Sequence, residues 1–185
     1  MAEYYLISQL PSLDGISENT PLPIDEERFF ELCGQHLGKK AQKDIAELTI
    51  TPPTNAEDVS SDLLNKWYDC ERNLRLALSK VRAEKLNKPF DLQNKILPTE
   101  MLKIASDAAN EDNPLRAEEM LLKFRLNLLE ALRPMDTFSL DYVFYYGLKL
   151  KLIMRMRKFD SKLGETAYRD IYNSILDGNR TEEIL

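Results

Sequence analysis

The sequence predicts an all-α fold: an elongated multi-helix bundle with two long central helices and, as an option, a small N-terminal lobe. Only 6 glycines accompany 25 Lys+Arg and 31 Asp+Glu, a balance that favours long polar-faced helices over a turn-rich sandwich. Apolar residues recur every three or four positions over long stretches, and prolines separate these stretches. At 185 residues the chain fits one helical domain, residues 1–185, with a lobe boundary, if there is one, near residues 51–58.

The first third of the chain predicts two short helices. Asp25-Glu26-Glu27 follows a proline-rich loop and places negative charge on the first turn of a helix that runs to about His36. A second helix is expected from Lys39 to Leu48. A β-strand is plausible at Tyr4–Leu10 and near Leu48–Thr51, although two such short strands make no sheet of any size.

Longer helices follow. The apolar spacing predicts a helix from Ser61 to about Leu86, and Pro98 opens a shorter one that runs through Ala109. Asn113-Pro114 is a capping residue followed by a proline at the first helical position, so the next helix begins there and reaches Leu132.

The helix from Pro114 to Arg133 is the first of the two central helices. Its apolar residues cover an arc of about 200°, wider than the stripe of roughly 100° on a surface helix, so it should lie between other helices. Glu118 and Arg125 fall inside this arc, two turns or about 10 Å apart. We expect each to find a partner on another helix and to act as a buried ionic pin rather than as a functional ionic site.

The second central helix should run from Thr137 to Asp160. Gly147 lies inside it, and because glycine costs about 1 kcal/mol there relative to alanine, it should permit a close helix crossing. A basic ridge lies opposite much of the apolar face and is open to three interpretations: a solvated face, an anion site, or a surface that docks an acidic partner. It consists of Lys151, Arg155, Lys158 and Lys162. A last helix is expected from about Gly164 to Leu176.

Residues that carry out chemistry are scarce. The single histidine, His36, lies near a glycine-bounded helix end, and Cys33 and Cys70 fit neither zinc spacing nor a disulfide framework. Residues 34–40 lack the spacing and the Ser/Thr of a phosphate loop. We therefore expect no catalytic residue, no metal site and no cofactor.

Charge argues against general binding of nucleic acid. Residues 1–60 hold eleven acidic and four basic residues, whereas the remainder is nearly neutral. The most apolar stretch, Phe138–Met156, contains Asp141, Lys149, Lys151 and Arg155, so we expect no membrane span, and the N-terminus lacks the layout of a signal peptide. A cytoplasmic location is the expectation.

Three segments carry a resemblance to a known family. They are Tyr4-Tyr5-Leu6-Ile7-Ser8-Gln9-Leu10-Pro11, Asn113-Pro114-Leu115-Arg116-Ala117-Glu118, and Phe138-Ser139-Leu140-Asp141 with the later Tyr145-Tyr146-Gly147-Leu148-Lys149-Leu150 and Arg155. Together they resemble the C subunit, also known as the d subunit, of V-type and A-type ATPases, specifically its short bacterial relatives. The likeness spans the N-terminus and residues 113–163.

The resemblance implies an all-helical, non-catalytic component of a rotary ATPase. Such a component joins the central shaft to the membrane rotor ring, so its partners are the other rotary ATPase subunits and it is bound to the membrane only through the complex. The full-length family member has a three-part pseudo-repeat, and a chain of 185 residues corresponds to part of it. Two other classes remain open: a stand-alone helical adaptor or assembly factor, and a small enzyme that works through carboxylates.

Overall fold

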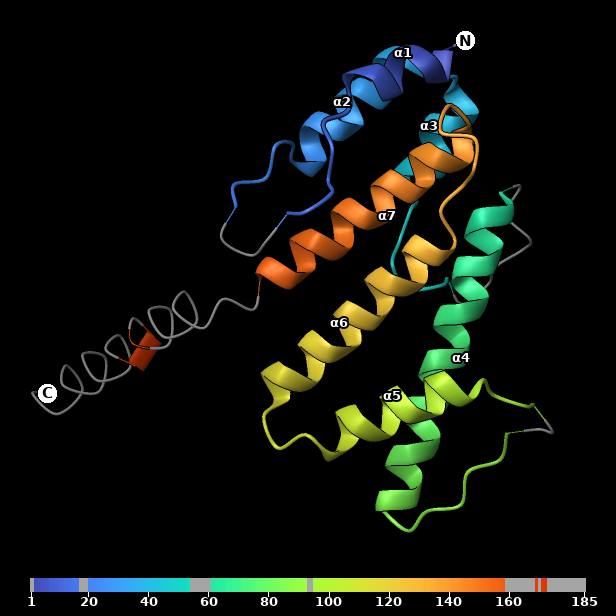
Figure 1. Cartoon of the computed structure of the whole chain (residues 1–185), viewed down its shortest axis with the longest axis vertical. Helices are drawn as coiled ribbons and strands as arrows, with labels where there is room; N and C mark the ends of the chain where they lie inside the picture. Colours follow the sequence, from blue (N-terminus) through green and yellow to red (C-terminus); the bar gives the residue numbers. More distant parts are fainter. Residues whose placement is uncertain are drawn as a thin grey trace, which may run out of the picture.

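The computed structural model describes residues 2–16, 20–53, 61–92 and 95–158, together with residues 169, 171 and 172. This part of the chain contains helices and no strand, which confirms the all-α fold class (Figure 1). The helices are α1 (Ala2–Gln9), α2 (Glu26–His36), α3 (Lys39–Ala46), α4 (Asp62–Lys85), α5 (Thr99–Asn110), α6 (Pro114–Ala131) and α7 (Leu140–Arg157).

Side-chain caps set the starts of three helices where the sequence predicts them. Asp25, Ser61 and Asn113 each accept a hydrogen bond from a first-turn backbone N–H, at 2.8, 3.2 and 2.9 Å respectively. The start of α7 differs from the prediction, because Ser139 is its capping residue and accepts from the N–H of Tyr142. The predicted helix at 164–176 lies largely outside the described residues.

The strand that was plausible at Tyr4–Leu10 does not form, because α1 covers this segment up to Gln9. Tyr and Ile have good strand propensity, but the packing decides: Leu6 is fully buried, and α1 lies against α2 and α7. No strand forms at Leu48–Thr51 either. There the carbonyl of Ile50 accepts a hydrogen bond from the indole N–H of Trp67 at 3.1 Å, instead of joining a strand ladder.

Helix α7 lies at the centre of the bundle. It contacts α1, α2 and α3 on one side and α4 and α6 on the other, and its residues 143–150 are buried without a break (Figure 1). Gly147 permits this packing, because a Cβ atom there would lie 2.8 Å from Leu48 Cδ2 and 3.2 Å from Phe29 Cε1. The close approach predicted at Gly147 is therefore found against α2 and the segment after α3.

A second apolar cluster joins α4, α5 and α6. It includes Leu74 and Ala77 of α4, Met101 and Ala105 of α5, and Leu121 of α6. The opposite side of α6 packs against α7 through Leu122 and Leu129. Helix α6 therefore lies between α5 and α7, as its wide apolar arc predicts.

Candidate functional site

The basic ridge lies along the C-terminal half of α7. Lys151 forms an ion pair with Glu26 of α2, and Arg155 Nη2 lies 2.8 Å from the carboxylate of Glu118 on α6. Lys158 is exposed, and Lys162 lies outside the described residues. The structure thus places the three described cations on one side of α7, and two of them already bind neighbouring helices.

A groove of about 660 Å³ runs between this ridge and the segment that follows α3. Leu48, Ile50 and Met154 give it an apolar floor, and the ridge cations with Glu26 form its rim. The backbone N–H groups of residues 49–51 donate no hydrogen bond to any described part of the chain. The groove therefore offers apolar contact and positive charge to a molecule that lies along it.

Glu118 and Arg125 are not partners of each other. Arg125 Nε and Nη2 bind the two carboxylate oxygens of Glu71 on α4, each at 3.0 Å, and Glu71 is fully buried. Glu71 also accepts from Arg75 Nε at 3.1 Å. The predicted burial of Glu118 needs correction: its side chain is 24% exposed, because it faces the exposed end of α7 at Arg155. Of the two predicted pins, Arg125 alone is buried.

Sequence reasoning missed an ionic cluster around Lys149. This lysine lies in the buried run of α7, and its Nζ is 2.5 Å from Asp14 Oδ1 and 2.5 Å from Glu130 Oε1. Tyr145 donates its hydroxyl proton to the same Glu130 oxygen at 2.7 Å. The available signal was a lysine inside the otherwise uncharged run 142–150, since a lysine in such a place is buried with a partner.

Mutual neutralisation shifts the pKa values of this cluster. The hydrogen bond from Lys149 lowers the pKa of Asp14. Burial works to raise the pKa of Glu130, but hydrogen bonds from Lys149 and Tyr145 outweigh it and the net shift is downward. Burial likewise opposes the charge on Lys149, yet the two carboxylates raise its pKa overall. Lys149 is therefore charged and both acids are ionised at neutral pH.

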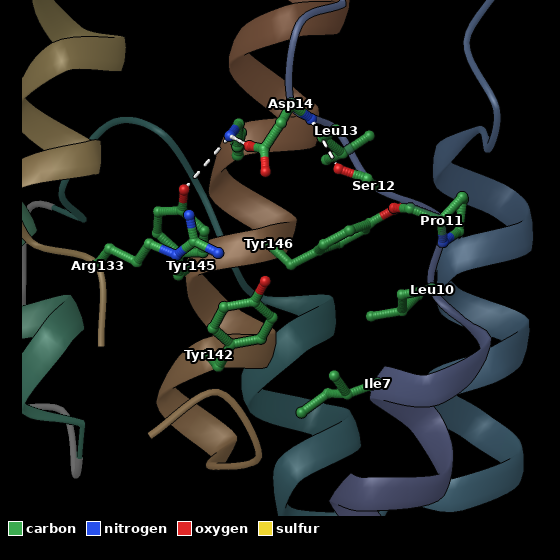
Figure 2. Close-up of a pocket in the computed structure, with 11 residues that line it drawn as sticks. Ile7, Leu10, Pro11, Ser12, Leu13, Asp14, Arg133, Tyr142, Tyr145 and Tyr146 are labelled. Atoms are coloured by element: carbon green, nitrogen blue, oxygen red, sulfur yellow. Dashed lines mark hydrogen bonds and ion pairs between the residues drawn. The ribbon is translucent and has the colours of Figure 1, made fainter. Parts of the chain in front are cut away.

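A pocket of about 250 Å³ adjoins the Lys149 cluster (Figure 2). One wall comes from residues 7–14, at the end of α1 and beyond it, and the other from α7 and Arg133 in the α6–α7 loop. Tyr142, Tyr145 and Tyr146 line it, and the hydroxyl of Tyr146 donates to the carbonyl of Pro11 at 2.8 Å. The N-terminal wall of the pocket is thus tied to α7 by a hydrogen bond.

The His, Cys, Asp and Glu side chains of the described residues form no group of three or more that could hold a metal ion. No helix in these residues has both the length and the apolar character needed to cross a bilayer.

The fold and the surface define an all-helical protein with a basic groove on its central helix. A family model described as "Protein of unknown function (DUF2764)" matches residues 87–179, which is half of the chain and includes α5, α6 and α7. The chain belongs to this family. No curated protein and no solved structure matched it.

Proposed function

We propose that this protein is a non-catalytic component of a V-type or A-type rotary ATPase, which couples the central shaft to the membrane rotor ring during proton or sodium transport. In this role it is cytoplasmic and reaches the membrane only through the other subunits. The sequence resemblance described above supports the proposal, and the all-helical fold is compatible with it.

The groove beside α7 is the observation that carries the proposal. Its apolar floor and positive rim are typical of a protein-docking surface, where apolar burial supplies affinity and charge selects the partner. Lys151 and Arg155 bind Glu26 and Glu118 across helices, so the rim is held by α2, α6 and α7 together. Because these ion pairs fix the rim to three helices, a force applied to a partner at the rim would be passed to the whole bundle, as a coupling subunit requires.

Affinity purification of the tagged protein from its native cells tests the proposal. We expect the wild type to retain rotary ATPase subunits and Lys158→Glu to lose them. Lys158 is chosen because it is exposed and forms no ion pair with any described residue, so reversing its charge leaves the bundle intact. Lys123→Glu, on the exposed side of α6, is the matched control and should behave as the wild type.

The outcomes separate the candidate functions. Recovery of unrelated proteins, without any part of an ATPase, contradicts the proposal and favours a stand-alone adaptor. Recovery of assembly intermediates without the complete ATPase identifies an assembly factor. If Lys158→Glu and the control retain the same subunits equally well, the groove is not the docking surface.

A further inference from the structure

We propose that the pocket between residues 7–14 and α7 binds a small organic carboxylate, with Arg133 holding the carboxylate group and the tyrosines enclosing an apolar body. This inference is independent of the proposed function. It concerns a different surface from the groove, formed by the opposite half of α7.

Arg133 is the charged group in this pocket that forms no direct ion pair with a described residue, although the charge of Asp14 attracts it. Its guanidinium carbon lies 5.8 Å from the centre of the Tyr142 ring and 5.7 Å from that of Tyr145, so both rings hold it in place. No carboxylate in the described part of the chain forms an ion pair with it. An arginine fixed by aromatic rings presents its N–H groups in the planar arrangement that binds a carboxylate at two points.

The other cation of the pocket, Lys149, is already paired. Lys149 is shared by Asp14 and Glu130, each at 2.5 Å, so the cluster of three carries one net negative charge that Arg133 balances at the pocket wall. Asp14 uses its Oδ1 atom on Lys149, and in Figure 2 both Asp14 and Arg133 lie toward Tyr145, opposite Leu10 and Pro11. The free donor capacity is therefore concentrated at Arg133, where Figure 2 also shows the hydroxyl of Tyr142 pointing into the same space.

Shape and lining define the rest of the ligand. A volume of about 250 Å³ is just below the usual range for drug-sized ligands, so the occupant is a small molecule. Ile7, Leu10 and the ring of Tyr146 offer it an apolar surface. Because these side chains come from both walls, a bound ligand would contact the N-terminal segment and α7 at once and stabilise their association.

Isothermal titration of the purified full chain tests the inference. The probes are benzoate, phenylacetate and 3-phenylpropanoate, each paired with its neutral amide of the same shape. We expect at least one carboxylate to bind at millimolar concentration or below, and its amide to bind at least tenfold more weakly. Arg133→Gln should weaken carboxylate binding by about ten- to a hundredfold, the usual contribution of hydrogen bonds to a charged group.

Arg116→Gln is the matched control, because Arg116 is an exposed arginine of α6 outside the pocket, and its affinity should equal that of the wild type. The bound carboxylate should also raise the melting temperature of the wild type and of Arg116→Gln, but not that of Arg133→Gln. Three results would overturn the inference: no carboxylate binds, amide and carboxylate bind equally, or folded Arg133→Gln binds as tightly as the wild type.

Discussion

Replacing Arg125 with methionine should destabilise the protein by about 3 kcal/mol. The substitution leaves the fully buried carboxylate of Glu71 without its two-point partner. Breaking a buried ion pair by removing one member costs about 3–5 kcal/mol, because the other charge stays buried and uncompensated. Arg75 still binds one oxygen of Glu71 in the variant and compensates part of its charge, although the Arg75 side chain is half exposed. We therefore expect a destabilisation near the lower end of the range of about 3–5 kcal/mol.

Replacing both members removes the buried charges instead of isolating one of them. Glu71→Met combined with Arg125→Met should lie within about 1 kcal/mol of the wild type, since apolar residues of similar volume often replace a buried pair without loss. The coupling energy between the two sites should therefore be at least about 2 kcal/mol.

Urea unfolding followed by circular dichroism measures these differences. A loss of about 3 kcal/mol moves the midpoint by about 1 M or more at the m-values of a domain of this size. Arg116→Met, at an exposed position on the same helix, is the control and should change stability by less than about 0.5 kcal/mol. Additive effects of the two single substitutions, with the double variant as unstable as their sum, would refute the reasoning.

Three further predictions concern packing, pH and thiol chemistry. Gly147→Ala should lower stability by about 1 kcal/mol, because overpacking outweighs the gain in helix propensity. Gly34→Ala should raise stability by about 0.5–1 kcal/mol, because the space around its Cβ is open. Urea unfolding measures both changes. The pKa values of Asp14 and Glu130 are lowered in the folded protein, so their ionised forms stabilise the fold above about pH 4. This stability should be lost as the pH falls through the folded-state pKa values. Thermal melts from about pH 7 to 2 measure the loss. Burial raises the pKa of Cys33 to about 12, so this thiol should resist a maleimide at neutral pH until the protein unfolds, as mass spectrometry will show.

Each of these has a contradicting result. Equal effects of alanine at the two glycines would mean that the contacts at Gly147 relax freely. An acid transition that is unchanged in Lys149→Met would mean that the lysine does not hold the two acids. Rapid labelling of Cys33 in the native state would mean that the site opens readily.

The starts of α2, α4 and α6 were predictable because their caps depend on neighbours along the chain. Asp25, Ser61 and Asn113 bind N–H groups two or three residues away, and that spacing is visible in a sequence. Helix α1 was not predicted, because its conformation depends on contacts that are distant in the sequence. Its apolar residues fit a strand or a helix, and contacts with α2 and α7, distant in sequence, decide between them.

Ionic partners were less predictable than the helices that carry them. The wheel position of Arg125 indicates that it is buried, but Glu71 is 54 residues away and nothing local pairs the two. The same applies to Lys149 and Asp14, which are 135 residues apart. The described members of the basic ridge, Lys151, Arg155 and Lys158, line one groove, whereas the other wall of that groove is a loop that only the tertiary fold brings there.

The central position of α7 has a consequence for biosynthesis. The ribosome makes α1, α2 and α3 first, yet the helix on which they rest is the last of those described to be translated. Until α7 leaves the exit tunnel, Leu6, Phe29 and their neighbours lack the surface that shields them from water in the folded bundle. The N-terminal third must therefore complete its folding after most of the chain has been synthesised, and a nascent chain that stalls before α7 presents an apolar surface to chaperones and proteases.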